Sequence, residues 1–366
     1  MAVPSVVRHG ARSVASALTR RWPSHSRLFF VGERVRWSID HDLVELAIIA
    51  AKLGVPIGPR RMLSAARDQA VFYGSQFTLL REPWRPSSHR LATAYFHGRP
   101  GTPGFPEFDE CYRVLCEHHG ELARVQVSHS EMHDLVLSSG IDPSKVFRIP
   151  IGVNMAYFTR QTEDSRAAAR SALGLPDEAF VVGSFHKDGV GMGEGSVPKS
   201  IKGPDTLLAA LELLHRSVPE LHVLLAGPAR GYVRSGLERL GIPYRHRILE
   251  RYEDVAGLYG ALDAYVVPSR QEGGPKGIFE AMASGIPVVT TRVGQAMDLV
   301  FDGGNAWMVD VDDAEGLAHR LSHIASRPSE LDEVVERGIE TARANSYEAQ
   351  LPLWRDFLRG LVEPAR

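Results

Sequence analysis

One stretch, residues 264–289, constrains the fold more than any other part of the chain. An apolar run, Ala264 to Val267, leads into a glycine-rich loop and then into a segment with helical spacing of its apolar residues. Pro275 suits the first helical turn, where a missing N–H has no partner to lose, and Gly285 suits the helix end. A second apolar strand, Ile286 to Val289, completes a βαβ unit of a parallel sheet.

Two carboxylates mark this unit: Glu272 in the loop, and Glu280 among the apolar side chains of the helix. One interpretation places Glu280 on the solvent-exposed face of an ordinary helix, as is usual for a lone Glu. The other uses the free N–H groups of Gly273, Gly274 and the helix start, which together with the helix dipole attract phosphate. Ligands of parallel sheets bind beyond the carboxyl ends of the strands, where this loop lies.

The whole string, Ser269-x-x-Glu-Gly-Gly-Pro followed by Glu280-Ala-Met-Ala-Ser-Gly-Ile-Pro-Val-Val, has seven residues between its two glutamates. It resembles the E-x7-E signature of retaining family-four glycosyltransferases. The run Lys-Val-x-x-Ile-Pro-x-Gly-Val-Asn154 resembles the crossing between the two domains of that family. The resemblance implies an α/β protein of GT-B fold, with two Rossmann-like doubly wound domains facing across a cleft. It places an acceptor-side domain at 1–152 and a nucleotide-sugar domain at 153–345, with a terminal helix, 346–366, packing back on the first domain.

The implied reaction transfers a sugar from a nucleotide-diphosphate sugar to an unidentified acceptor (a glycan, a lipid-linked molecule, a small molecule or a protein), with retention and without a metal or other cofactor. The resemblance makes Glu272, His97 and Lys202 catalytic, and it gives Glu280 the ribose hydroxyls. The expected donor-binding residues are Lys187, Lys199, Lys202, Gly273, Gly274, Pro275, Lys276, Glu280, Ile248 and Leu249. Rival interpretations are a catalytically silent GT-B subunit that binds nucleotide or a partner, and an epimerase or phosphorylase on the same fold.

A glycine-dense loop, residues 189–195, follows a predicted strand and precedes Lys199 and Lys202. It is not a Walker loop, because Pro198 occupies the place of the glycine before the lysine. It is also too long for the tight turn of a dinucleotide fingerprint. A flexible surface loop is one interpretation, and a set of lysines that receives a diphosphate is the other. The Arg usual at the end of this strand in the family is absent, and Lys187 is the nearest cation that could replace it.

Two further features are open to more than one interpretation. His97 follows a predicted strand, where a histidine is either structural or, by the resemblance, in contact with the donor. Asp310-Val-Asp312 has the D-x-D form of a metal motif from a different glycosyltransferase fold. We expect Asp312 instead to cap the helix that begins at Ala314, and we expect no metal site.

The net charge of −2 argues against a general nucleic-acid-binding surface. Two cysteines lack zinc-site spacing and fit a reducing compartment. No apolar run approaches the roughly 18 residues of a membrane span, so we expect a cytoplasmic protein. Residues 1–27 carry five arginines and no acidic residue. They are interpreted as a frayed or leading helix, a transit-like segment, or a basic amphipathic helix that contacts the inner face of a membrane. The oligomeric state is left open.

Other predicted elements alternate along the chain as a parallel doubly wound sheet requires. Phe77 to Leu80 is a candidate strand, Ser130 is expected to cap a helix that ends at Gly140, and helices are expected at 255–262 and 346–362. The remaining expected strands are 27–32, 70–74, 91–96, 125–128, 146–154, 179–185, 221–226 and 244–249, and the remaining helices are 43–53, 108–119, 205–216, 231–240 and 314–325.

Overall fold

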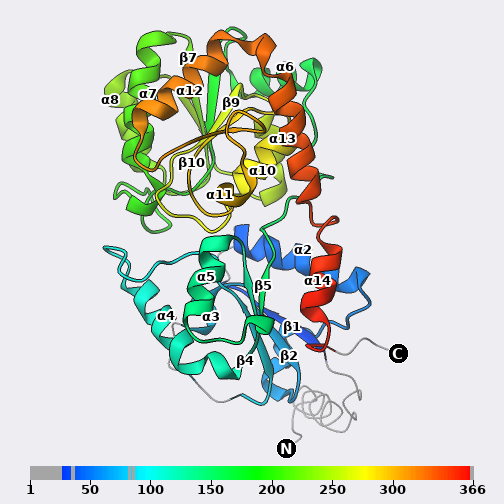
Figure 1. Cartoon of the computed structure of the whole chain (residues 1–366). Helices are drawn as coiled ribbons and strands as arrows, with labels where there is room; N and C mark the ends of the chain where they lie inside the picture. The colour runs from blue at the N-terminus through cyan, green and yellow to red at the C-terminus, as the bar shows by residue number, and fades with distance from the viewer. Residues whose placement is uncertain (1–26, 34–37, 81–83, 85–86, 363–366) are drawn as a thin grey trace, which may run out of the picture.

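The computed structural model describes residues 27–33, 38–80, 84 and 87–362. They form two α/β units, one above the other in Figure 1, and each is built on a parallel sheet. Two Rossmann-like domains with parallel sheets were predicted, and this part of the fold prediction is confirmed. The predicted basic helix before residue 27 lies outside the described residues.

The sheet of the first unit has the strand order β1-β2-β3-β4-β5. Its strands are β1 (Leu28–Val31), β2 (Ala70–Tyr73), β3 (Arg90–Ala94), β4 (Leu122–Val127) and β5 (Val146–Arg148). On the free side of β1 the chain adds a short parallel bridge. The Leu28 N–H donates to the Pro56 carbonyl (2.9 Å), and the Gly58 N–H donates to the Leu28 carbonyl (2.8 Å). The order of chain segments therefore reverses at β1, and ligands of open α/β sheets bind at such a reversal.

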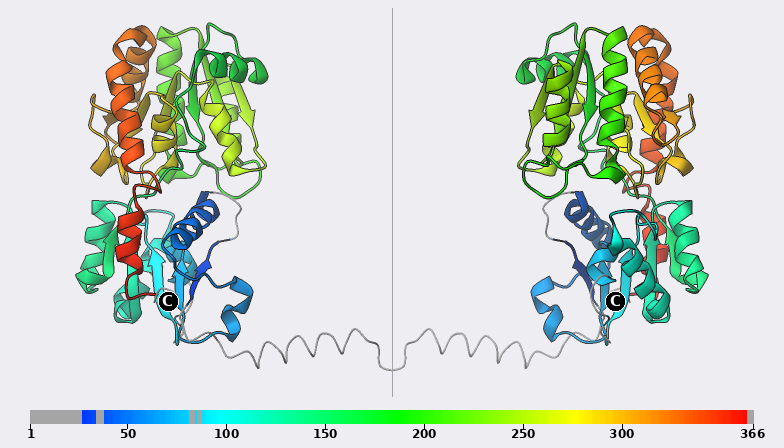
Figure 2. Two further views of the ribbon diagram at one scale, coloured as in Figure 1. Left: turned by 90° about the vertical axis from the view of Figure 1, so that its right-hand side faces the viewer. Right: turned by 90° about the vertical axis from the view of Figure 1, so that its left-hand side faces the viewer.

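Helices cover both faces of this sheet. Helices α2 (Ser38–Lys52) and α14 (Leu351–Leu358) pack on one face, and α4 (Pro106–His118) and α5 (Ser130–Ser138) pack on the other. Short helical turns are η1 (Arg60–Ala65), α3 (Gln76–Leu79), η2 (His119–Glu121) and η3 (Pro143–Lys145). In α14, Trp354 and Phe357 meet Phe72 edge to face, at ring distances of 6.0 and 5.8 Å. The last helix of the chain thus completes the core of the first unit (Figure 2).

The sheet of the second unit has the order β11-β10-β9-β6-β7-β8, so the chain order reverses between β6 and β9. Its strands are β6 (Phe180–Ser184), β7 (Leu221–Ala226), β8 (Tyr244–Arg247), β9 (Ala264–Val267), β10 (Val288–Thr291) and β11 (Trp307–Val309). One face carries α7 (Pro204–Ser217), α8 (Gly231–Leu240) and α12 (Ala314–Ser326). The other carries α6 (Glu163–Leu173), α9 (Ala256–Tyr259), α10 (Lys276–Ala283), α11 (Ala296–Leu299) and α13 (Asp332–Ala344). Short 3-10 turns are η4 (Ser200–Lys202), η5 (Tyr252–Val255) and η6 (Pro328–Glu330).

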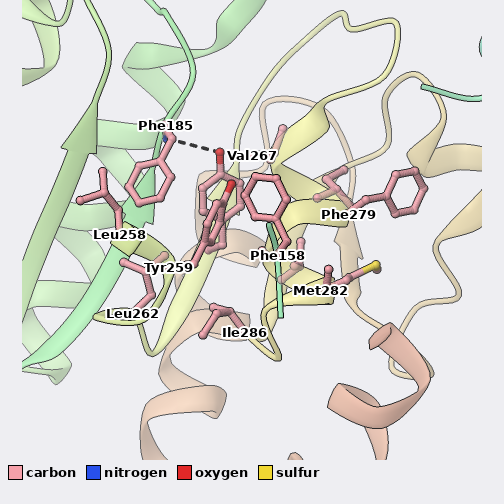
Figure 3. Packing of buried hydrophobic residues seen from close by; sticks show 14 of the residues in the cluster. Phe158, Phe185, Leu258, Tyr259, Leu262, Val267, Phe279, Met282 and Ile286 are labelled. Carbon is pink, nitrogen blue, oxygen red and sulfur yellow. Dashed lines mark hydrogen bonds between the residues drawn. The ribbon is translucent and has the colours of Figure 1, made fainter. Parts of the chain in front are cut away.

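An aromatic cluster supports the carboxyl ends of β6 and β9 (Figure 3). The ring of Tyr259 lies edge to face with Phe185 at 5.0 Å and with Phe158 at 5.8 Å. The Phe185 N–H donates to the Tyr265 hydroxyl at 3.3 Å, which satisfies a backbone donor just beyond the strand. Buried aromatic contacts of this kind fix side-chain positions, so the loops that follow both strands start from a rigid base.

Polar contacts join the two units where the chain crosses between them. The Tyr347 N–H donates to the Val153 carbonyl (3.1 Å), so the outgoing and returning crossings are bonded to each other. Gln295 of the second unit holds the outgoing crossing: the Ile151 N–H donates to its Oε1 at 2.8 Å, and its Nε2 donates to the Ile151 carbonyl at 3.2 Å. The Ser128 hydroxyl donates to the Gly273 carbonyl across the interface at 3.0 Å.

The central unit forms as predicted up to the helix end, and its second strand begins later than predicted. Strand β9 and helix α10 lie at the expected residues, and Gly285 has φ +74°. Strand β10 begins at Val288 rather than Ile286. The Ile286 N–H donates to the Ala281 carbonyl at the helix end, and Pro287 has no N–H to give to a ladder.

Several local predictions were wrong, including the strand expected at 146–154, of which only β5 forms. Phe77 to Leu80 is not a strand but lies at helix α3, which begins because the Ser75 hydroxyl accepts from the Phe77 N–H (3.1 Å). Ser130 does not cap α5. Its hydroxyl instead donates to Asp298 Oδ1 of the second unit at 2.5 Å.

The cap of α12 is Asp313, which accepts from the Gly316 N–H at 2.7 Å, and not Asp312. The helices expected at 255–262 and 346–362 are shorter. The first is split into η5 and α9, and α14 begins only at Leu351, with Pro352 in its first turn.

Candidate functional site

A cavity of about 310 Å³ lies between the two units, beyond the carboxyl ends of their strands. His97 follows β3, Lys187 follows β6 and Glu272 follows β9, so three separate strand ends supply its wall. Its lining residues are Glu33, His97, Phe185, His186, Lys187, Met192, Lys199, Lys202, Pro228, Tyr252, Val255, Tyr265, Val267, Glu272, Gly274, Pro275, Lys276, Gly277 and Glu280. This is the position at which open α/β sheets bind ligands.

A larger cavity, of about 410 Å³, lies at the opposite ends of β6 and β9. Two of its charged residues, Arg166 and Asp263, are bonded to each other at 2.5 Å, and Asp263 also accepts from Arg170 at 2.6 Å. The remaining charged residues of this cavity are carboxylates, Asp177, Glu178 and Glu220, which do not favour an anionic ligand. We therefore assign the candidate site to the smaller cavity.

Glu272 is held by one cation and one hydroxyl. Lys202 Nζ lies 2.6 Å from Glu272 Oε1, and the Ser269 hydroxyl donates to the same oxygen at 2.8 Å. Gly203 allows this approach: it has φ +59°, and a side chain there would collide with the Pro268 carbonyl. The sequence analysis missed Ser269, although its place at the end of a buried strand, three residues before Glu272, was a usable signal.

Two lysines of the cavity have no carboxylate within ion-pair distance among the described residues: Lys187 and Lys199. Burial, with a contribution from Lys202, lowers the pKa of Lys199 to about 8. Burial also lowers the pKa of Lys187, whose Nζ lies 3.4 Å from Met192 Sδ. Unpaired cations held partly out of water favour an anionic ligand, because an anion would replace the lost hydration.

Glu280 is buried, with 4% of its surface exposed, so the solvent-facing interpretation is excluded. Its carboxylate accepts one hydrogen bond from the Tyr252 hydroxyl and one from the Tyr259 hydroxyl (2.9 Å). Burial raises the pKa of Glu280, and the nearby Lys276 and the two hydroxyls act against that shift. The sequence analysis gave neither tyrosine a role toward Glu280, although their spacing of seven residues puts them two helical turns apart.

Lys276 lies in the cavity wall, but its charge is already paired. Its Nζ is 2.5 Å from Asp42 Oδ1 of α2, and it lies 4.7 Å from the centre of the Tyr252 ring. Asp42 also accepts from the Tyr347 hydroxyl at 2.6 Å. This group of side chains joins the two units at the edge of the cavity, and Asp42 was not predicted to take part.

His97 enters the cavity from the first unit. Its ring lies between Phe77 and Phe108, each 5.6 Å away, and its backbone carbonyl accepts from the Gln76 side chain. Burial lowers the pKa of His97 to about 3, and Lys202, Lys199 and His129 add to the shift. The imidazole is therefore neutral at physiological pH, and its Nδ1 has no partner within the described residues.

The glycine-dense loop is tied down at its base and at its tip. At the base, Arg230 and Asp188 form a buried ion pair at 2.9 Å, and the Val190 N–H donates to the Val197 carbonyl at 2.9 Å. Near the tip, the Gly231 N–H donates to the Glu194 carbonyl at 2.7 Å. The interpretation as an unstructured surface loop does not fit these contacts. Sequence analysis missed Arg230, which is distant in the chain and leaves no motif.

Three predicted donor-binding residues do not line the cavity: Gly273, Ile248 and Leu249. Ile248 is 72% exposed, and Leu249 packs against the core of the second unit. The Gly273 carbonyl accepts from Ser128 and from the Gln295 N–H, so it joins the units. A Cβ at Gly273 would lie 2.6 Å from Phe96 Cβ, so only glycine permits this approach.

The D-x-D aspartates pair with arginines. Asp310 accepts from Arg292 at 3.2 Å, and Asp312 accepts from Arg270 at 2.6 Å. The described residues contain no cluster of three or more His, Cys, Asp or Glu side chains arranged for a metal ion. None of the described helices combines the length and the apolarity that a membrane crossing needs.

A match to a known family lies within the second unit. Residues 192–327 match the model of the family Glycosyl transferases group 1. D-inositol 3-phosphate glycosyltransferase of Saccharomonospora viridis is 34% identical over 249 residues, which cover 62% of this chain and 54% of that protein. The same-named protein of Corynebacterium urealyticum is 30% identical over 254 residues, covering 64% and 57%. The chain spans about half the length of the curated relatives it matches.

Solved structures share the whole architecture. The crystal structure of Anabaena HepE in complex with UDP and glucose has a TM-score of 0.72 and 17% identity, covering 92% of this chain and 99% of that chain. Sucrose-phosphate synthase of Thermosynechococcus elongatus has a TM-score of 0.61 and 21% identity, covering 86% and 76%. These similarities establish the GT-B fold of two Rossmann-like domains.

Proposed function

We propose that this protein transfers a sugar from a nucleoside diphosphate sugar to an acceptor. The observation that carries the proposal is the arrangement in one inter-domain cavity of two unpaired lysines, a Lys–Glu pair and a buried glutamate. The match of residues 192–327 to a glycosyltransferase family supports it, as do the UDP complexes of HepE. Catalytic residues are proposed to be Glu272, Lys202 and His97.

The proposed roles follow the charges along the cavity. Lys187 and Lys199 receive the diphosphate, and Lys202 adds positive charge as the bond to the leaving group breaks. Glu272, beside Lys202, stabilises positive charge that develops on the anomeric carbon. Glu280 accepts hydrogen bonds from the ribose hydroxyls. The neutral His97 faces the donor sugar from the first unit.

We further propose that the reaction retains the anomeric configuration and needs no divalent metal. The lysines supply the electrostatic stabilisation that a metal gives elsewhere. The test is an assay in EDTA, with manganese or magnesium added back. Activity that EDTA removes and a metal ion restores would contradict this part of the proposal. Product anomers read by NMR decide between retention and inversion.

For the acceptor, we propose a class of molecules with which a screen should begin. The relatives named D-inositol 3-phosphate glycosyltransferase make inositol phosphates the first acceptors to test, and HepE makes UDP-glucose the first donor.

The main test is ligand binding followed by turnover. We expect UDP and UDP-glucose to raise the melting temperature and free glucose not to, because the lysines bind phosphate. A ligand at a hundred times its dissociation constant stabilises by about 2.7 kcal/mol. Equal stabilisation by glucose would contradict the proposal. Release of UDP from the donor separates an enzyme from a silent subunit, and conversion of the donor sugar without UDP release would indicate an epimerase.

A further inference from the structure

Tyr252, which donates to Glu280, begins the short turn η5 and follows a loop with exposed side chains. In that loop Ile248 is 72% exposed, and Glu250 and Arg251 are exposed as well. A side chain beside such a loop has few local contacts to hold it, so contacts from elsewhere in the fold must place its hydroxyl. The tertiary contacts of Tyr252 therefore affect how the Glu280 carboxylate is held.

One of these contacts comes from the first unit. The ring of His41, in α2, stacks on the ring of Tyr252, with the ring centres 4.4 Å apart and the planes at 26°. His41 Nδ1 also lies 3.9 Å from Glu253 Oε1, so one side chain meets two consecutive residues of η5 across the domain interface. His41 is 9% exposed and does not line the cavity, so its effect on a ligand there would pass through other side chains.

His41 is itself held in place. Its Nε2 lies 3.4 Å from Oε1 of Glu45, which is one helical turn further along α2. Glu45 is 4% exposed, and the same oxygen accepts from Asn154 Nδ2 at 2.8 Å. A buried carboxylate keeps its hydrogen-bond partners, because losing them leaves the desolvation of its charge uncompensated. The crossing between the two units at Asn154 is thus connected to η5 through Glu45 and His41.

This series of contacts ends at Glu280. Tyr252 and Tyr259 donate to different oxygens of its carboxylate. An ionised carboxylate has about four acceptor positions, so each oxygen keeps one for the hydroxyls of a ligand. Tyr259 lies in the buried aromatic cluster of the second unit, whereas Tyr252 is contacted from the first unit. One of the two hydroxyls that orient Glu280 therefore depends on contact between the units.

We infer that His41 is a positioning residue for the nucleotide end of the donor: it holds Tyr252, and through it the Glu280 carboxylate, in the orientation that receives the ribose hydroxyls. This inference rests on the proposed function, and it makes the ribose site depend on a side chain of the first unit. Loss of His41 should weaken donor binding while the lysines that receive the diphosphate stay in place.

The test measures binding of UDP, and of dUDP, which lacks one ribose hydroxyl, by titration calorimetry to the wild type and to His41→Ala. We expect UDP binding to weaken by about two- to threefold, the size of one modest hydrogen bond, and the preference for UDP over dUDP to shrink. KM for the donor should rise by a similar factor with kcat nearly constant.

A conservative variant and a matched control accompany this measurement. His41→Phe keeps a ring that can stack on Tyr252, so it should retain most of the UDP affinity. His118→Ala is the control, because His118 also stacks on an aromatic ring, that of Trp84 at 4.7 Å, and also lies beside a carboxylate, that of Glu121 at 2.9 Å, but does not line the cavity. It should bind UDP like the wild type.

A double-variant cycle separates positioning from a merely structural role. Tyr252→Phe removes the hydroxyl that donates to Glu280, and should itself weaken UDP binding by about two- to threefold. Because His41 acts through that hydroxyl, adding His41→Ala should cost little more, and the double variant should lose about two- to threefold rather than about four- to ninefold. Independent losses would overturn the inference. Tighter UDP binding by Tyr252→Phe would show that the phenol competes with ribose, and would also overturn it.

The remaining outcomes distinguish this inference from the proposed function. If the wild type does not bind UDP, the proposed function fails. If the wild type and His41→Ala bind UDP equally, only the His41 inference fails. An unchanged preference for UDP over dUDP, or a His41→Phe variant as weak as His41→Ala, would also contradict it. If His41→Ala does not fold, His41→Leu, which fills the space without a planar ring, gives the same comparison.

Discussion

The two glutamates of the central unit line the same cavity but are held by different kinds of side chain. Glu272 is held by the Lys202 ammonium and the Ser269 hydroxyl, and Glu280 is held by two neutral phenols in a buried position. The contacts of Glu272 thus place its carboxylate beside a cation at the cavity wall. Neutral donors and burial favour a carboxylate that makes fixed hydrogen bonds. Glu272 and Glu280, with seven residues between them, therefore suit different roles.

The largest expected effect is that of Lys202→Ala on kcat. Removing one group that stabilises the leaving diphosphate should lower kcat by roughly 10²- to 10³-fold, with a smaller change in donor affinity. Lys187→Ala should cost less, because Lys187 has no contact with Glu272. Steady-state kinetics of both variants provides the check. A larger effect at Lys187 than at Lys202 would reverse the assignment.

Glu272→Gln keeps the shape of the side chain and removes its charge. We expect kcat to fall on the order of 10²-fold while UDP affinity persists, because the carboxylate acts mainly in the transition state. Since Lys202 and Glu272 touch, the double variant should lose less than the product of the two single losses. If Glu272→Gln lost only UDP affinity, the proposed difference between the roles of Glu272 and Glu280 would be wrong.

The ionisation of Lys199 should determine how kcat/KM for the donor changes at high pH. With a pKa of about 8 in the free protein, Lys199 is charged below pH 8 and neutral above it. The ratio kcat/KM for the donor, which reports free-enzyme pKa values, should fall by about tenfold in total as the pH rises through that value, and then level off. Lys199→Met should remove this limb and lower kcat/KM at pH 7 by about tenfold. Lys145→Met, a lysine away from the cavity, is the control. If kcat/KM of Lys199→Met fell at high pH as it does in the wild type, the fall would belong to another group.

The smallest effect is expected from Glu280→Gln. Its hydrogen bonds to ribose would be equal in the ground and transition states, so KM should rise by about threefold with kcat nearly constant. Tyr259→Phe removes one of the two hydroxyls that hold Glu280, and should give a smaller rise of the same kind. A fall in kcat without a change in KM would show that the two glutamates do not differ as proposed.

Local patterns predicted the second unit better than the first. Strand β9, helix α8 and strand β7 begin and end at their predicted residues, because apolar runs and glycine ends mark them clearly. In the first unit Phe77 to Leu80 resembled a strand, but a serine cap and the contacts of His97 make it helical. The segment at 56–58 bonds to β1 by only two hydrogen bonds, which no local pattern specifies.

The candidate site, like the fold, was only partly predictable from local sequence patterns. The central motif located Glu272 and Glu280, and the glycine-dense loop after β6 located Lys187, Lys199 and Lys202. The partners of these residues could not be found in this way. Asp42 reaches Lys276 across the domain interface, and Arg230 reaches Asp188 from the start of α8. Such pairs depend on tertiary packing, and a single sequence does not contain that information in any short window.

The return of α14 to the first unit affects how the chain folds during synthesis. Trp354, Phe357 and Leu358 complete the apolar face of β1 and β2, which is made from residues about 280 to 330 positions earlier in the chain. While the ribosome translates the second unit, α2 covers that face without α14. The first unit can thus reach its final packing only after residues 351–362 have left the exit tunnel. Until then the nascent chain presents an incompletely covered apolar sheet face that a chaperone could bind, and the second unit can fold before the first is finished.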